Sequence, residues 1–480
     1  MNQTARTFVF VGLVVSILLA MHLLPTIVVE DVELRHVNLL SDVLPEVYQQ
    51  RDGIDVIPKP VPPKPARRRK NAAADSTAAT VSADSSATVT GADEAQPSGL
   101  QANETNGDCL LADYSEGKPG GMGHFYERLA TASDHVVRIA YYGDSFIEGD
   151  ILTADLREML QERFGGNGVG WVDCTDRLDG FRPTIRLKSR GFKAYEVVQK
   201  PYSHRAEGIA QRYFVPAADA RCWATGTSSR KHAAQWQHSS LFVRTDSGMT
   251  VNTYADGDSI GLKHVDGSEH VQSIQLDRAS MRSVGYRFSD LTERSFVYGM
   301  ALEGTHGIVL DNLSMRGSAG YTIANIPSST LNDFARLRPY DLIVLHFGLN
   351  VANEKSHAAN YKAYIKRMEK AVRHLQAAFP QASILIVSMP DRDQRTDSGI
   401  RTMLGVESLV AYQQILASNC GVAYFNLFQA MGGRESMKAL VDRGLGAKDY
   451  THLTHAGGKR LARLFFEALM QDYNDYHHGQ

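Results

Sequence analysis

The sequence predicts a three-layer α/β fold that is interrupted by an all-β insert. Apolar runs alternate with amphipathic helical patterns over residues 135–165 and 305–475. Strands that are apolar on both faces and alternate with helices are typical of a parallel sheet covered on both sides. Residues 175–300 instead contain short alternating segments between Gly, Asp and Ser turns, which is the pattern of an antiparallel sandwich. The β domain is therefore expected after the first helix of the α/β domain and before its second strand.

Five apolar runs are the predicted strands of the α/β domain. They are HVVRIAYY (135–142), GIVLDNLSM (307–315), DLIVLHFG (341–348), ASILIVSMP (382–390) and VAYFNLF (422–428). The clearest helix covers residues 360–379, because apolar side chains recur there on one face with the helical period. That face consists of Tyr361, Ile365, Met368, Val372, Leu375 and Phe379.

Residues 1–25 are predicted to anchor the chain in a membrane. The run from Phe8 to Leu24 is almost wholly apolar, and its 17 residues lie at the lower limit for a bilayer-spanning helix. No small-x-small cleavage site follows the run, which favours an uncleaved anchor over a cleaved signal peptide. Arg6 precedes it and acidic residues follow it, so the N-terminus is expected in the cytoplasm and the remainder on the exported side. The sequence thus predicts a single-pass protein of the inner (cytoplasmic) membrane with a periplasmic domain.

Residues 26–107 are predicted to connect this anchor to the folded part. The first half is a mixed apolar and acidic membrane-proximal segment, and from Pro58 to about Gly107 the composition is dominated by Pro, Ala, Ser and Thr. Such a segment buries too little apolar area to offset its ordering entropy, so a disordered linker is expected. The basic run Arg67–Lys70 lies inside it and is interpreted as a solvated feature of the tether.

Charge and cysteine content exclude two classes of function. A net charge of −2 provides no electrostatic footprint for nucleic acid. No CxxC motif or His/Cys cluster indicates a metal site, and no cofactor motif is evident, so neither is expected. Four cysteines allow three disulfide pairings on the exported side, and the sequence does not choose among them. They are Cys109, Cys174, Cys222 and Cys420.

The tripeptide Gly-Asp-Ser occurs twice, and its surroundings separate the two copies. Ser145 follows a predicted buried strand and precedes the helical pattern DILTADLREMLQERF. It is therefore expected at the carboxyl end of a strand, where open α/β sheets bind ligands, among unpaired backbone N–H groups at the start of a helix. Ser259 lies between polar residues and a β segment, and is predicted to be a turn residue. Ser145 is the candidate nucleophile.

A serine nucleophile needs a base that is held by a third group. Asp449 and His452 are three residues apart, just before the last amphipathic helix. On a loop, that spacing lets the carboxylate reach one imidazole nitrogen while the other faces a serine. His455 lies closer to the helix and is interpreted as a capping or surface residue.

Two further strand ends provide candidate oxyanion donors. Asn350 follows the strand that ends in HFG, and its side-chain amide can donate to a developing oxyanion. Gly317 follows the strand that ends in NLSM, and a glycine there lets a backbone N–H approach closely. Asp391, Arg392 and Asp393 follow another strand, and are interpreted as turn residues rather than as part of the cleft.

These residues resemble the GDSL-type, or SGNH, hydrolase superfamily. Its blocks centre on a Ser in Gly-Asp-Ser, a Gly, an Asn in Gly-x-Asn and a His in Asp-x-x-His, and the resemblance covers about 135–172 and 300–475. It implies a flavodoxin-like sandwich, the triad Ser145, His452 and Asp449, and no cofactor or metal. It also implies an oxyanion hole from the backbone amides of Ser145 and Gly317 and the side chain of Asn350.

One position departs from the superfamily pattern. The third block usually continues with Asp after Asn350, and here Val351 takes that place, which removes a supporting hydrogen bond. The segment FVYGMALEGTHGIVLDNLSMRG is similar to the one that follows the insert in periplasmic peptidoglycan O-acetylesterases. That subgroup interrupts the same fold with a β-sandwich resembling a carbohydrate-binding module.

The resemblance also sets the expected domain order. It is an anchor at 1–25, a membrane-proximal segment and linker at 26–107, the first part of the hydrolase domain at 108–174, the inserted β-sandwich at 175–300 and the second part at 301–480. All three tryptophans fall in or beside the insert, and each is interpreted as a core aromatic in preference to a sugar-stacking platform. They are Trp171, Trp223 and Trp236. Cys174 and Cys222 are close enough in sequence to cross-link the insert.

The resemblance implies an exported serine esterase that removes O-acetyl groups from a cell-envelope glycan, with peptidoglycan as the expected substrate. A glycan O-acetyltransferase with the same triad is the alternative, because only the final acceptor differs. A catalytically inactive glycan-binding protein is the second alternative. It is disfavoured because a purely structural protein does not need the complete set of Ser, Gly, Asn, Asp and His.

Overall fold

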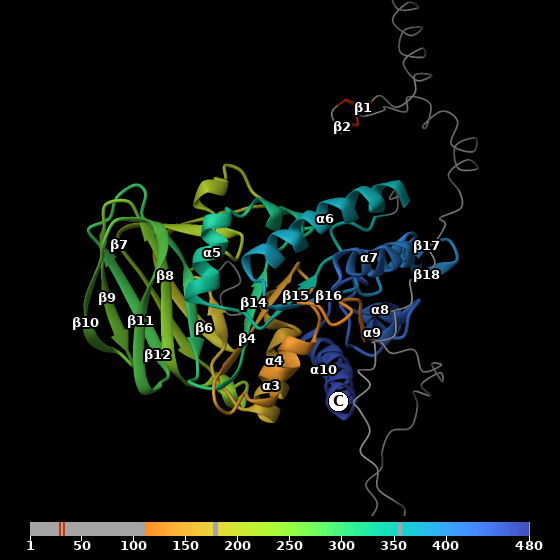
Figure 1. Cartoon of the computed structure of the whole chain (residues 1–480), viewed down its shortest axis with the longest axis horizontal. Helices are drawn as coiled ribbons and strands as arrows, with labels where there is room; N and C mark the ends of the chain where they lie inside the picture. The colour runs from red at the N-terminus through yellow and green to blue at the C-terminus, as the bar shows by residue number, and fades with distance from the viewer. Residues whose placement is uncertain (1–27, 30–31, 34–110, 176–180, 354–357, 480) are drawn as a thin grey trace, which may run out of the picture. The chain divides into compact units, whose positions relative to one another are not determined.

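A computed structural model of the chain describes residues 28–29, 32–33, 111–175, 181–353 and 358–479 (Figure 1). The predicted anchor at 1–25, nearly all of the predicted linker, and Cys109 lie outside these residues. Among the residues that the structure does describe, no helix has the length and apolar character needed to cross a membrane.

The chain divides into two units, Met1–Ile57 and Pro58–Gln480. In the first, β1 (Val28–Val29) pairs antiparallel with β2 (Val32–Glu33). The described part of the second contains a six-stranded sheet, a nine-stranded sheet and all the candidate site residues, together with a two-stranded sheet of β17 (Asp393–Thr396) and β18 (Gly399–Thr402).

The α/β part of the second unit is built on a six-stranded sheet. Its strand order is β14-β4-β15-β16-β19-β3. The strands are β3 (Leu111–Asp113), β4 (Val136–Gly143), β14 (Gly307–Ser314), β15 (Leu342–His346), β16 (Ser383–Val387) and β19 (Ala423–Phe425). The five predicted runs form the five parallel strands, which are buried as their apolar character requires.

The prediction of a wholly parallel sheet was wrong at one edge. Strand β3 pairs antiparallel with β19, with Leu111 opposite Phe425 and Asp113 opposite Ala423, so the sheet is mixed. A strand of three residues is too short to display a period, so no sequence pattern indicates β3. The Asp113 carboxylate then accepts hydrogen bonds from the amides of Ser115 and Met122, and this fixes the turn into the first helix.

Helices cover both faces of this sheet (Figure 1). Helices α4 and α10 contact each other on one face, and α6 contacts α7 on the other. The helices are α3 (Gly123–Ala130), α4 (Thr153–Phe164), α5 (Ser328–Leu337), α6 (Ala358–Ala378), α7 (Val406–Cys420), α8 (Leu427–Ala430), α9 (Ser436–Asp442) and α10 (His455–His478). Short 3-10 turns are η1 (Glu148–Asp150), η2 (His204–Ala206), η3 (Lys231–Ala233) and η4 (Tyr321–Asn325). All six apolar residues predicted for one face of the helix at 360–379 are buried, which confirms that helical pattern.

The second sheet is all-β and antiparallel, with nine strands (Figure 1). They are β5 (Gly170–Val172), β6 (Ile185–Glu196), β7 (Arg212–Gly226), β8 (Trp236–Thr245), β9 (Met249–Ala255), β10 (Asp258–Val265), β11 (Ser268–Met281), β12 (Ser283–Ser289) and β13 (Phe296–Glu303). Side chains from these strands form an apolar core of their own. Cys174 and Cys222 lie in this core as free thiols that contact each other. Burial raises the pKa of the Cys174 thiol.

The two sheets share one packed boundary. Trp171 on β5 stacks on Phe242 of β8 with ring centroids 5.5 Å apart, and its ring edge meets Phe334 of α5 at 6.0 Å. The chain leaves the α/β part beside the point where it returns, because the Ile308 amide donates to the Gly165 carbonyl at 2.9 Å. The insert therefore packs directly against the α/β part at this boundary while keeping its own apolar core.

Candidate active site

Ser145 and His452 meet although 307 positions separate them in the sequence. Ser145 Oγ lies 2.9 Å from His452 Nε2, and His452 Nδ1 lies 2.7 Å from Asp449 Oδ2. Ser145 follows the carboxyl end of β4, and His452 lies on the loop before α10. The three side chains thus form a continuous chain of hydrogen bonds, with the geometry of a hydroxyl, a base and an orienting carboxylate.

A tight turn brings Asp449 back onto His452. Tyr450 has a left-handed backbone with φ of 54°, and the Asp449 Oδ1 atom accepts the amides of Thr451 and His452, each at 3.0 Å. Burial alone would raise the pKa of Asp449, but the hydrogen bonds from the His452 ring and from these two amides hold that pKa below its usual value. Asp449 is therefore ionised at neutral pH and fixes the tautomer of His452.

Ser145 sits in a turn and not at the start of a helix. The sequence placed it at the start of a helix, but α4 begins at Thr153 and the turn η1 comes between. Asp144 is buried and accepts the Phe146 amide at 3.0 Å, which closes the turn around Ser145. Burial raises the pKa of Asp144 to about 6. A Cβ on Gly143 would lie 2.9 Å from the His346 carbonyl oxygen, so the strand end before this turn requires a glycine.

The two candidate oxyanion residues follow the strands that flank β4 in the sheet. Gly317 comes after β14 and Asn350 comes after β15, while both strands pair with β4. Gly317 has a φ of 82° and is exposed. One N–H of the Asn350 amide donates to the Ser318 carbonyl at 2.9 Å, which ties the two loops together and leaves the second N–H for a ligand.

A comparison with known protein families finds one match. The family model described as GDSL-like Lipase/Acylhydrolase matches residues 284–460. The chain resembles the GDSL-type hydrolases. The matched segment holds Gly317, Asn350, Asp449 and His452, and Ser145 precedes it because the all-β insert separates the first GDSL block from the other three.

One solved structure has a similar fold. It is titled "Peptidoglycan O-acetylesterase in action, 5 min" and matches with a TM-score of 0.61 and 21% identity, over 76% of this chain and 99% of that chain. A family two carbohydrate esterase from Clostridium thermocellum has 10% identity over 59% of this chain and 98% of that chain, at a TM-score of only 0.26. No curated protein matches the chain. Together with the GDSL match, the first structure shows an SGNH-like α/β hydrolase fold with a mixed sheet and an additional all-β region.

Arg392 supports the loop that carries Asn350, a role the sequence did not indicate. Its guanidinium donates to the carbonyls of Leu349 and Ala352, each at 3.0 Å, so it brackets Asn350 from both sides. These bonds hold the loop that carries Asn350 and Val351. The sequence around Arg392 indicates only a turn. Its hydrogen-bond partners lie 40 or more positions away, so no local pattern reveals them.

The remaining candidates lie away from the triad or have structural roles. Ser259 is the second residue of β10 rather than part of the turn, and it donates to Asn252 on the neighbouring strand. Thr454, and not His455, caps α10, since its hydroxyl accepts the Gly457 amide.

The tryptophans and the two aspartates after β16, Asp391 and Asp393, are buried or half-buried. Trp171 and Trp236 are buried, while Trp223 is half-buried beside Tyr254. Asp391 is buried, and burial raises its pKa to about 7, while the Asp393 carboxylate accepts the Lys438 amide.

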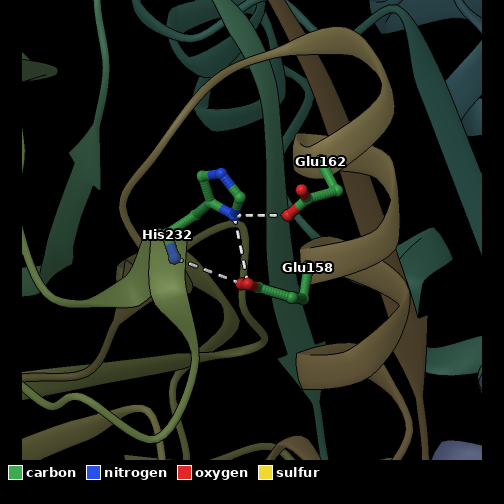
Figure 2. A group of neighbouring side chains, drawn as sticks. All are labelled: Glu158, Glu162 and His232. Atoms are coloured by element: carbon green, nitrogen blue, oxygen red, sulfur yellow. Dashed lines mark hydrogen bonds and ion pairs between the residues drawn. The ribbon is translucent and has the colours of Figure 1, made fainter.

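One group among the described residues has its candidate ligand atoms close enough to hold a metal ion (Figure 2). Glu158 and Glu162 lie one turn apart on α4, and His232 comes from η3 of the insert, with the ligand atoms within 4.8 Å of one another. His232 Nδ1 lies 3.1 Å from Glu158, and the Lys231 ammonium lies 3.4 Å from Glu162. Since a lysine already lies against one carboxylate, we interpret the group as an ionic contact between α4 and the insert.

Proposed function

We propose that this protein is a serine esterase that removes O-acetyl groups from a cell-envelope glycan, with peptidoglycan as the substrate. The hydrogen-bonded chain from Ser145 through His452 to Asp449 carries the proposal, because it supplies an activated nucleophile without any cofactor. The GDSL-like family match supports an esterase. The similarity in fold to the structure titled as a peptidoglycan O-acetylesterase supports an acetylated glycan as the substrate class.

In the first half-reaction, Ser145 attacks the acetyl carbonyl. His452 takes the hydroxyl proton as the new bond between Oγ and the carbonyl carbon forms, and ionised Asp449 stabilises the resulting imidazolium. The oxyanion accepts hydrogen bonds from the backbone amides of Ser145 and Gly317 and from Asn350. When the intermediate collapses, the bond to the sugar oxygen breaks and His452 protonates that oxygen, which leaves acetyl-Ser145.

In the second half-reaction, water attacks the acetyl carbon of the acyl-enzyme. His452 takes a proton from the water and returns it to Ser145 Oγ as the ester bond breaks, so acetate leaves and the enzyme is regenerated. The acceptor therefore defines the activity, because a sugar hydroxyl in place of water would make the same site an acetyltransferase.

We further propose that the catalytic domain works on the exported side of the inner membrane. The apolar run Phe8–Leu24 with its charge asymmetry supports an anchor, and the Pro/Ala/Ser/Thr-rich stretch from Pro58 to Gly107 supports a long tether. A tether of about 50 residues reaches some 40 Å on average, which suits an enzyme that must meet a polymer away from the bilayer.

The two Gly-Asp-Ser copies provide a matched experiment. Wild type, Ser145→Ala and Ser259→Ala are treated with a fluorophosphonate probe and then with O-acetylated peptidoglycan, other acetylated polysaccharides and an aryl acetate. We expect Ser145→Ala to lose both labelling and acetate release, and Ser259→Ala to behave as wild type. Labelling that persists in Ser145→Ala would refute the assignment of the nucleophile. Acetyl transfer to added glycan with little free acetate would indicate a transferase.

A further inference from the structure

Phe181 is an exposed aromatic side chain that contacts the segments following Ser145 and His452. Four large hydrophobic side chains are markedly exposed in the part of the chain that the structure describes, and Phe181, at 46%, is the aromatic one among them. We propose that Phe181 is the stacking platform of a sugar-binding subsite next to Ser145, and that it binds one pyranose ring of the glycan. This inference rests on the proposed function.

The Phe181 ring contacts both segments that carry the catalytic pair. It lies over Gly149, four residues after Ser145, where an added Cβ would come within 2.4 Å of the ring. Gly149 also has a left-handed φ of 66°, so a glycine is required there by both conformation and space. The ring also meets that of His455, three residues after His452, in a tilted arrangement with centroids 5.3 Å apart. Phe181 therefore lies against the turn that follows Ser145 and the start of the helix that follows His452.

The residues after Phe181 are fixed to the same loop. Arg182 donates to the Asp150 carboxylate at 2.9 Å and to the Trp171 carbonyl at 2.9 Å, while Thr184 donates to Asp150 at 2.7 Å. Asp150 directly follows Gly149, so the backbone that leads to Phe181 is attached to the turn that follows the nucleophile. A platform that is held in place before binding loses little conformational entropy when a ligand arrives.

The chemistry of the position suits a sugar ring. One face of a pyranose presents C–H groups, whose partial positive charge is attracted to the negative face of an aromatic ring, and its edges carry hydroxyls. The surroundings of Phe181 are polar, with the His455 imidazole against the ring and the Arg316–Glu148 ion pair on the loops next to Ser145. A lipid acyl chain would need a continuous apolar surface, and this site has a single aromatic ring in a polar setting.

A point substitution tests this inference more cleanly than removal of the insert. Removing the insert would take Phe242 away from Phe334 and Arg182 away from Asp150. The Phe181→Leu variant keeps an apolar side chain but loses the flat face, whereas Phe181→Trp retains it. Leu262→Ala is the matched control, because Leu262 is 70% exposed on β10 of the same insert.

The measured quantity is kcat/KM on O-acetylated glycan oligomers divided by kcat/KM on an aryl acetate. We expect this ratio to fall about 3–10-fold in Phe181→Leu and to stay near the wild-type value in Phe181→Trp and Leu262→Ala. Calorimetric titration of the same oligomers into Ser145→Ala, with and without Phe181→Leu, should show a matching loss of affinity. An unchanged ratio and affinity in Phe181→Leu, with an active wild type, would refute the subsite alone. A wild type that is labelled by fluorophosphonate but releases acetate from no glycan would refute the proposed function, and the subsite with it.

Discussion

Asp150→Asn is predicted to lower the free energy of unfolding much more than the same substitution at an exposed aspartate. The Asp150 carboxylate is only 1% exposed and lies where the insert meets the α/β part. It accepts two hydrogen bonds of 3.0 Å from Arg157, one of 2.9 Å from Arg182 and one of 2.7 Å from Thr184. Burial by itself would raise the pKa of Asp150, but these two guanidinium groups hold that pKa well below its usual range, so the group is charged at pH 7.

The magnitude follows from the two arginines that would be left behind. The Arg157 side chain is 2% exposed and that of Arg182 is 12% exposed, so neither can regain water when the carboxylate becomes an amide. Removing one partner of a buried ion pair costs about 3–5 kcal/mol, because an uncompensated charge stays in the interior. We expect a loss of that size in the free energy of unfolding.

Asp219→Asn is the matched control. Asp219 also has a φ of 64° and also pairs with an arginine, Arg287, but more than half of each of these two side chains is exposed. Since asparagine tolerates the left-handed region as well as aspartate does, backbone effects are the same in the two variants. Guanidinium chloride unfolding at pH 7, followed by tryptophan fluorescence, compares both with wild type. Equal losses in the two variants would refute the reasoning, since burial is the property that distinguishes the pairs.

Three further predictions concern the site and its support. Asp449→Asn should lower kcat on an aryl acetate about 10³–10⁴-fold, because the orienting carboxylate is lost while Ser145 remains, and steady-state kinetics measures this. Arg392→Ala should lower kcat about tenfold or more through displacement of Asn350, and Arg392→Lys should not restore it, because one ammonium cannot span the two carbonyls that the guanidinium holds. Burial lowers the pKa of His346 from 6.5 to about 3, so between these pH values the folded state binds fewer protons than the unfolded chain. The contribution of neutral His346 to the free energy of unfolding is therefore fully present above pH 6.5. It should fall by about 5 kcal/mol as the pH decreases toward 3. In His346→Phe, the free energy of unfolding measured from denaturant curves should depend less steeply on pH over this range. An unchanged dependence on pH would contradict the assignment to His346.

The residues of the candidate triad could be recognised in the sequence because their signals are local. Gly-Asp-Ser after an apolar run and Asp-x-x-His before a helix each fit within a few positions, and strand ends of one sheet lie along one edge. In the structure, Ser145 Oγ lies 2.9 Å from His452 Nε2. The sequence indicates this proximity only because both residues are expected at the same edge of the sheet.

The supporting residues could not be found in this way, because their partners are distant in sequence. Arg392 hydrogen-bonds to a loop 40 positions earlier, and Phe181 lies against Gly149 and His455 from an inserted segment. Neither has a periodic or motif-like signal. The short strand β3 was missed for the simpler reason that three residues cannot show a pattern.

The edge strand β3 has a practical consequence for where this chain can be cut. Leu111–Asp113 covers the outer hydrogen-bonding groups of β19, which would otherwise be a bare sheet edge able to pair with another molecule. A truncated protein that begins at residue 115 would uncover that edge and release the Met122 amide from Asp113, so it should self-associate. One that begins a few residues before Leu111 should remain monodisperse, and light scattering would tell the two apart.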